Sequence, residues 1–226
     1  MKLKYLLIIP ILSSTIFAFN SAEYISSDHC DKLVTNPYFK VCYDYNLMGA
    51  KAITYTLDRD KINEINIKKR PSFHTEKSLE RAYRVSPKSY TRTGYDRGHM
   101  ANDASFDWSM ESLNSTYSMV NIVPQDPKVN RYHWIKVERY ARLVARKLGS
   151  LNVLNIIRYP NNPKHISRQH IAIPEGFYKI LYNEEKDFER CFYYKNDASS
   201  YPKKNKMKNH LIECSFIEPN LLYPSS

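Results

Sequence analysis

The stretch Tyr95-Asp96-Arg97-Gly98-His99-Met100 places an acid, a guanidinium, a glycine and an imidazole in four consecutive positions. Such a cluster is unusual for a hydrophobic core and for an ordinary solvated surface. In a chain of formal net charge +11, a histidine beside an arginine points to chemistry on a phosphate group. Taken alone, His99 is explained equally well as a structural histidine whose hydrogen bonds are satisfied within the fold.

The chain has 226 residues, of which 42% are hydrophobic, so it can form one packed domain or at most two small ones. No internal repeat of 20–50 residues is visible. The excess of lysine and arginine favours a polyanionic partner such as nucleic acid, anionic lipid or acidic glycan. A basic surface that serves only solubility is the alternative, and net charge does not choose between the two.

The first residues have the pattern of a signal peptide. Lys2 and Lys4 precede a mostly apolar stretch over residues 6–17, and Ala18 is a plausible cleavage position, with Ala22 as a second choice. We therefore expect a signal peptide over residues 1–18 and a periplasmic or secreted product with no stable membrane insertion after cleavage. A retained N-terminal anchor is the alternative.

The four cysteines are Cys30, Cys42, Cys191 and Cys214. In an exported protein an even number of cysteines predicts disulfides, and three pairings are possible. The pairing local in sequence is Cys30–Cys42 with Cys191–Cys214, and each bond would contribute about 3 kcal/mol by closing a short loop. The spacing does not match a zinc site.

Residue patterns predict a chain of strands around one long helix. Residues 41–45 and 52–57 suit a hairpin with a turn at 46–49, and residues 61–69 suit a short strand or an extended segment. The further strands are predicted at residues 116–123, 151–159, 169–173, 177–181, 188–194 and 211–217. Residues 128–148 carry apolar side chains at steps of three and four, which predicts a helix that Gly149 ends.

Residues 70–98 are basic and irregular. They hold seven cations and only three acids, with tyrosines at positions 83, 90 and 95 between them. Cations interleaved with aromatic rings suit phosphate contacts and base stacking. For any single residue here, a solvated loop is the alternative.

A second pattern runs along the predicted helix. Asn130, Trp134, Glu138 and Arg142 follow at steps of four, so they form one slowly drifting stripe on a helix face. Each has an ordinary explanation: Asn130 as a helix N-cap, and Glu138 with Arg142 as a common ion pair on a helix surface. Their occurrence together, after the Asp96–His99 cluster, favours a site.

With these motifs, residues 94–142 resemble the DNA/RNA non-specific endonucleases of the ββα-metal, or His-Me finger, family. The matching motifs are DRGH at 96–99, N-x-x-P-Q at 121–125 and N-x₃-W-x₃-E-x₃-R at 130–142. Val120 stands where the family often has serine. The resemblance extends over about residues 40–182 within a single nuclease domain at 19–226, and the C-terminal extension at about 183–226 has no family counterpart.

The resemblance implies a role for each motif residue. His99 would be the general base that activates water, and Asn130 the one direct protein ligand of Mg²⁺, with Mn²⁺ as a substitute. Glu138 would hold metal-bound waters. Arg97 and Arg142 would neutralise charge on the phosphate.

Further positions follow less directly from the resemblance. Asn121 would orient the substrate or the imidazole, and the substrate-binding candidates are Arg70, Arg92, Asp96 and Arg131. Asp96 has a second interpretation as a support for the motif loop. Gly98 would let the backbone turn tightly before the histidine.

The implied fold is α+β, a central antiparallel sheet with the metal-binding helix packed on one face. The implied activity is an exported, Mg²⁺-dependent endonuclease that hydrolyses DNA and RNA and leaves 5′-phosphates. Its partners are these nucleic acids, and a homodimer is left open. The alternatives are a secreted basic DNA-binding envelope protein with an inactive nuclease fold, and a hydrolase of another phosphodiester on the same scaffold.

Overall fold

The computed structural model describes residues 24–62 and 66–217. The expected signal peptide at residues 1–18 and both candidate cleavage positions lie outside these residues. Within the two described ranges, no helix has the length and apolar character needed to cross a membrane.

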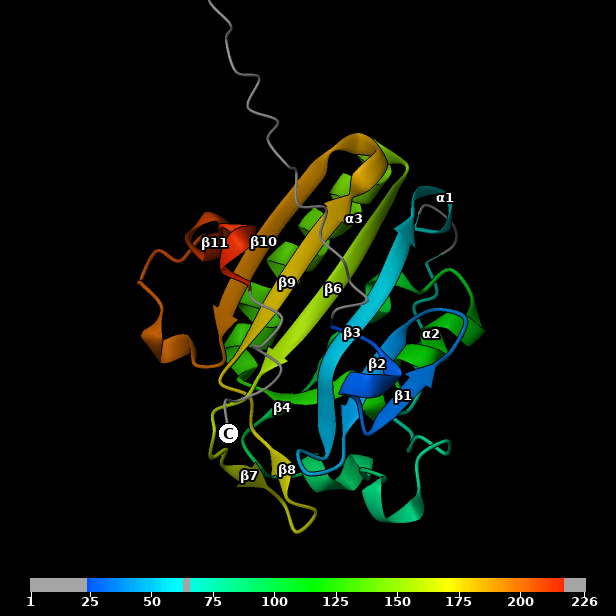
Figure 1. Ribbon diagram of the computed structural model, residues 1–226, viewed down its shortest axis with the longest axis vertical. Coiled ribbons are helices and arrows are strands. Elements are labelled where there is room, and N and C mark those ends of the chain that lie inside the picture. Colours follow the sequence, from blue (N-terminus) through cyan, green and yellow to red (C-terminus); the bar gives the residue numbers. More distant parts are fainter. Residues whose placement is uncertain (1–23, 63–65, 218–226) are drawn as a thin grey trace, which may run out of the picture.

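A seven-stranded sheet, antiparallel throughout, forms the centre of the molecule (Figure 1). Its strands, in spatial order, are β1 (Lys32–Thr35), β2 (Lys40–Asp44), β3 (Gly49–Asp58), β6 (Ser150–Arg158), β9 (Gly176–Asn183), β10 (Phe188–Lys195) and β11 (Leu211–Ile212). The predicted hairpin is confirmed as β2–β3, and the strands predicted at 151–159, 177–181 and 188–194 are β6, β9 and β10.

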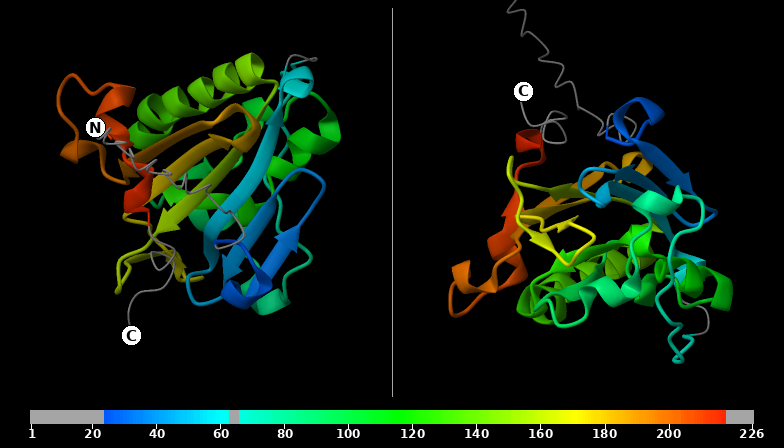
Figure 2. Two further views of the ribbon diagram at one scale, coloured as in Figure 1. Left: turned by 45° about the horizontal axis from the view of Figure 1, so that its top comes forward. Right: turned by 90° about the horizontal axis from the view of Figure 1, so that it is seen from below.

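One face of the sheet carries α2 (Met110–Thr116), α3 (Ile135–Leu148) and the small pair of β4 (Asp96–His99) with β5 (Ile122–Gln125) (Figure 2). The apolar residues of α3 pack with inward residues of β3, β6 and β9 in the main hydrophobic cluster. The α+β class and the helix on one sheet face are therefore confirmed.

The opposite face is covered by segments from both ends of the described chain. Tyr24 packs there against the outward residues of the central strands, and its hydroxyl donates a hydrogen bond to the carbonyl of Ile217 at 2.9 Å. Both disulfides, Cys30–Cys42 and Cys191–Cys214, lie at this face, so the pairing local in sequence is confirmed. They hold the two ends of the described chain on the side away from α3.

Four predicted elements were wrong in part. Of the short strand or extended segment predicted at 61–69, residues 61 and 62 belong to the short helix α1 (Arg59–Ile62), and residues 66–69 form no strand. The strand predicted at 169–173 is reduced to β8 (Ile171–Ala172), which pairs with β7 (His165–Ile166). The strand predicted at 211–217 ends after Ile212, because a 3₁₀ turn follows at Cys214–Phe216.

The strand predicted at 116–123 is β5, which begins at Ile122 and ends at Gln125. Thr116 ends α2, whose first turn is closed by reciprocal hydrogen bonds between Ser109 and Ser112, and a 3₁₀ turn follows at Met119–Asn121. The strand then runs through Pro124 to Gln125. Proline is tolerated there because, among the described residues, β5 pairs only with β4, so one edge of β5 has no strand beside it.

Candidate active site

The DRGH residues form strand β4, paired in register with β5 so that Gly98 lies opposite Val123 and His99 opposite Ile122. A side chain at Gly98 does not fit, because its Cβ would lie 2.6 Å from the Cβ of Gln125. The glycine therefore allows the close approach of the two strands that fixes His99.

The segment after β5 starts the long helix. Asp126 accepts hydrogen bonds from the backbone amides of Lys128 at 2.8 Å and Val129 at 2.9 Å, with Pro127 between them. A π-helical turn at Val129–Trp134 follows and continues into α3. Asp126 is therefore the cap, and the alternative that Asn130 caps the helix was wrong: Asn130 lies inside the π turn, a feature often found at functional sites.

Asp96 joins the strand to this turn. The amide nitrogen of Asn130 donates to its carboxylate at 3.0 Å, and the guanidinium of Arg131 donates twice, at 2.8 and 2.6 Å. Burial raises the pKa of Asp96, but the hydrogen bonds from Arg131 and Asn130 outweigh it and hold the pKa below its ordinary value. Both predicted substrate contacts, Asp96 and Arg131, are thus engaged with each other.

His99 lies between aromatic rings. The centroid of Phe73 is 5.3 Å from the imidazole, and that of Tyr117 is 4.9 Å away and edge-on. Among the described residues its buried Nε2 atom has no hydrogen-bond partner. Burial lowers the pKa of His99 to about 4, with Asp103 opposing the shift and Arg70 adding to it. The imidazole is therefore neutral at neutral pH and able to accept a proton.

Asn121 is fully buried and is held by the backbone around it. Its amide nitrogen donates to the carbonyls of Ala101 and Thr116, both at 2.8 Å, and its amide oxygen accepts from Ala101 at 2.7 Å. Its backbone carbonyl accepts from Met100. This side chain fixes the segment that follows His99, so any orienting effect on the imidazole passes through that segment.

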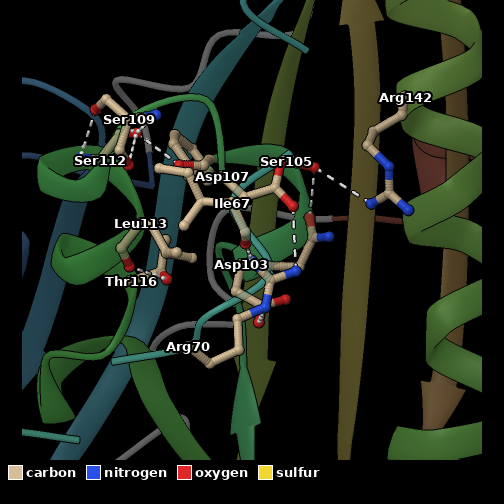
Figure 3. A network of polar contacts seen from close by, with 12 residues as sticks. Ile67, Arg70, Asp103, Ser105, Asp107, Ser109, Ser112, Leu113, Thr116 and Arg142 are labelled. Atoms are coloured by element: carbon tan, nitrogen blue, oxygen red, sulfur yellow. Dashed lines mark hydrogen bonds and ion pairs between the residues drawn. The ribbon is translucent and has the colours of Figure 1, made fainter. Parts of the chain in front are cut away.

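Arg70 is held by two aspartates that the sequence reading missed (Figure 3). Its guanidinium lies 3.2 Å from Asp103 and 3.1 Å from Asp107. Asp103 also accepts a hydrogen bond from Tyr117 at 2.9 Å, which links Arg70 to the ring packed on His99. Residues 102–107 carry no periodic pattern. The one sequence signal for Asp103 and Asp107 is that these acids follow the DRGH motif at 96–99 within a few residues.

Glu138 and Arg142 occupy the helix side of the site. Burial raises the pKa of Glu138 to about 7, although Lys179 and Arg142 oppose the shift. Burial lowers the pKa of Arg142, and its Nη1 atom donates to Ser105 at 3.4 Å (Figure 3). Ser105 is two residues from Asp103, so the helix and the loop after β4 meet here. Lys179 is a further charged residue that the sequence reading missed.

The side chains of the other two predicted arginines, Arg97 and Arg92, differ in how far the surrounding protein holds them. Arg97 donates twice to the carbonyl of Pro87, at 3.1 and 2.6 Å, and stacks over Phe73. Arg92 is exposed, in a left-handed backbone conformation with φ of 59°. Of the seven cations at 70–98, five are exposed: Arg70, Lys77, Arg81, Lys88 and Arg92.

The donor set at the start of α3 suits a hydrated hard cation. Asp96 holds the amide nitrogen of Asn130, so the amide oxygen is the atom available to a metal. Mg²⁺ keeps several waters and needs few protein ligands, and Glu138 lies two helical turns further along. The described residues hold no group of three or more His, Cys, Asp or Glu side chains suited to a metal. An ion at this site would be bound through Asn130.

This β-pair followed by a helix, with an imidazole on the strand and an amide at the helix start, is the arrangement of a ββα-metal nuclease fold. The family model described as DNA/RNA non-specific endonuclease matches residues 20–218. The chain belongs to the DNA/RNA non-specific endonuclease family, as the resemblance predicted.

Relatives with curated names are nucleases. Human mitochondrial Endonuclease G is 26% identical over 160 residues, which cover 66% of this chain and 54% of that protein. The Nuclease of Nostoc sp. is 37% identical over 119 residues, which cover 51% of this chain and 42% of that protein. The chain thus spans about half the length of these relatives.

A solved structure of the EndoG/EndoGI complex, described as showing the mechanism of EndoG inhibition, matches the fold with a TM-score of 0.74. The match has 18% sequence identity and covers 84% of this chain and 83% of that one. It extends the structural likeness beyond the motif residues to most of the chain.

Proposed function

We propose that the protein is an exported, Mg²⁺-dependent endonuclease that hydrolyses phosphodiester bonds in DNA and RNA without base specificity and leaves 5′-phosphates. The observation that carries the proposal is the neutral imidazole of His99 on the same strand as Asp96, which holds the amide of Asn130. The nuclease names of the relatives and the family membership support it.

His99 accepts a proton from the attacking water, a role that a neutral imidazole fills and that typically accelerates a reaction about 10²- to 10⁴-fold. Arg97 and Arg142 face charge that develops on the phosphate, and Glu138 accepts hydrogen bonds from waters around Asn130. When bound, Mg²⁺ would stabilise negative charge on the leaving 3′ oxygen and on one phosphoryl oxygen.

Base specificity is weak in this proposal because the contacts are with the sugar–phosphate backbone. The exposed cations of residues 77–92 capture the polyanion, so activity falls as salt rises. Export follows from the expected signal peptide at residues 1–18, and a periplasmic or secreted location suits two disulfides. Mass spectrometry of the exported protein would locate the mature N-terminus.

The deciding experiment incubates supercoiled plasmid with Mg²⁺ and the wild type, His99→Ala or His165→Ala, with EDTA as a further arm. His165 is an exposed histidine on β7, so it is the matched control. We expect nicking by the wild type and by His165→Ala, and a loss of about 10²- to 10⁴-fold in His99→Ala. Ligation of the cut ends without prior phosphorylation would establish the 5′-phosphate.

An inactive wild type that still binds DNA would replace the proposal by the alternative, a DNA-binding envelope protein with an inactive nuclease fold. Asn130→Ala makes a second distinction. It should lose most activity yet keep its affinity for DNA measured in EDTA, since its role is to hold the metal and not the substrate.

A further inference from the structure

Lys179 is a lysine on β9, an inner strand of the sheet, with none of its surface exposed. Side chains alternate along the strand, so it points with Phe177 and Leu181 toward α3. A fully buried lysine is rare, because the desolvated ammonium is costly unless other groups compensate it. The reaction proposed above assigns it no role.

The contacts of the ammonium cross three neighbouring strands. Its Nζ atom donates to the side chain of Asn155 on β6 at 2.7 Å and to the hydroxyl of Tyr55 on β3 at 3.4 Å. Both partners in turn donate to one acceptor, the carbonyl of Met100, at 2.9 Å from Asn155 and 3.4 Å from Tyr55. Met100 directly follows His99, so this network ends at the backbone of the proposed base.

The same ammonium faces the helix half of the site. It lies 4.5 Å from the ring centroid of Trp134, where the π turn of Asn130 passes into α3. Next to burial, Lys179 is the strongest influence on the carboxyl of Glu138, and it favours the charged form. The influence is mutual, since Glu138 favours the charged form of Lys179 against burial.

We propose that Lys179 is a positioning residue of the active site: its ammonium favours the carboxylate form of Glu138 and, through Asn155 and Tyr55, holds the backbone next to His99. The inference rests on the proposed nuclease function, in which Glu138 must be a carboxylate to accept hydrogen bonds from metal-bound water. One buried charge thus serves both halves of the site, which come from distant parts of the chain.

The test replaces the charge and keeps the shape. Lys179→Met removes the ammonium, Lys179→Arg retains a cation, and Lys195→Met is the control on an exposed lysine of β10. The titration of Glu138 is followed by ¹³C NMR of the side-chain carboxyl in metal-free protein, with the resonance assigned through Glu138→Gln.

Loss of a neighbouring cation raises the pKa of a carboxyl, so the Glu138 midpoint should rise by about one pH unit or more in Lys179→Met. It should return toward the wild-type value in Lys179→Arg and stay unchanged in Lys195→Met. The acid limb of kcat should move to higher pH in Lys179→Met, while KM for DNA stays near the wild-type value. A purely structural role would lower stability without moving the midpoint.

Asn155→Asp tests the same proposal with the lysine in place. The new carboxylate pairs with Lys179 and partly neutralises its charge. The ammonium then favours the charged form of Glu138 less strongly, so the midpoint of the Glu138 titration should also rise. Unchanged midpoints in both Lys179→Met and Asn155→Asp would overturn the inference. The titration needs no activity, so this outcome is distinct from failure of the proposed function, which plasmid nicking by the wild type reports.

Discussion

Asn130 donates its amide hydrogen to Asp96 at 3.0 Å, and this contact joins strand β4 to the turn that begins α3. It fixes which end of the amide is turned toward the site, because the nitrogen is bonded and the oxygen is left as the free acceptor. The orientation of a side chain that would bind a metal is thus set by a residue that is not itself a candidate ligand.

Removing this contact should weaken metal binding. In Asp96→Ala the amide of Asn130 is free to rotate, so we expect Mg²⁺ affinity to fall by about 10- to 100-fold, as is usual when the partner of a ligand is lost. Calorimetric titration with Mg²⁺ measures it. Asp60→Ala is the control, since the Asp60 side chain is 85% exposed on α1. Equal Mg²⁺ affinity in Asp96→Ala and the wild type would contradict the proposed orientation.

The buried imidazole should make the fold sensitive to acid. The pKa of His99 is lowered to about 4 by burial, so between about pH 4 and 6.5 the unfolded chain binds more protons than the folded one. Stability from this group is therefore present at neutral pH and is lost as pH falls through this range.

The variant His99→Gln lacks that titration. When the pH is lowered from 7 to 5, the free energy of unfolding of His99→Gln should fall by about 2 kcal/mol less than that of the wild type. The reason is that the unfolded variant has no imidazole at this position to take up a proton. Urea unfolding at both pH values measures the difference. The comparison with the wild type is needed because Glu138 changes the stability in the opposite direction. Its raised pKa makes the folded chain bind more protons than the unfolded chain in part of this pH range. A constant difference between the two proteins would argue against a low pKa for His99.

The sequence predicted the elements whose signal is local. The four-residue spacing from Asn130 to Arg142 and the apolar periodicity around it were sufficient to predict the helix. Pairing each cysteine with the next one along the chain predicted both disulfides. The proposed metal and base positions came from the family resemblance, which rests on motifs of consecutive or regularly spaced residues.

What the sequence did not predict depends on contacts between distant residues. Lys179 lies 124 residues from Tyr55 and reads as an ordinary polar position in a strand. Asp103 and Asp107 meet Arg70 across more than thirty residues, in a loop without periodicity. Helix α2 was missed because serine has weak helix propensity, and the reciprocal hydrogen bonds of Ser109 and Ser112 cap its first turn.

The packing at Gly98 should be intolerant of a single methyl group. In Gly98→Ala the new Cβ would meet the side chain of Gln125, so we expect a loss of about 1–3 kcal/mol from overpacking, with a shift of His99 and reduced kcat. Thermal unfolding and plasmid nicking measure the two effects. Adding Gln125→Gly removes the atoms that clash, so the double variant should be more stable than the sum of the two single changes predicts. Simple additivity would show that another contact excludes the side chain.

The Cys191–Cys214 bond should contribute stability without affecting the chemistry. Replacing both cysteines by alanine should lower the free energy of unfolding by about 3 kcal/mol, the chain-entropy value for a loop of this order. The bond lies at the sheet face away from α3, so plasmid nicking at a temperature where the variant is folded should match the wild type. A fall in nicking under those conditions would mean that the C-terminal extension contributes to the active site.

The placement of Tyr24 and Ile217 on the sheet face opposite α3 has a practical consequence. A fluorophore or a surface tether attached near either residue is separated from the side that carries α3 by the full thickness of the sheet. The protein can therefore be immobilised or labelled near both residues while a long polymer passes across its other side. That geometry suits single-molecule observation of cleavage along a stretched DNA.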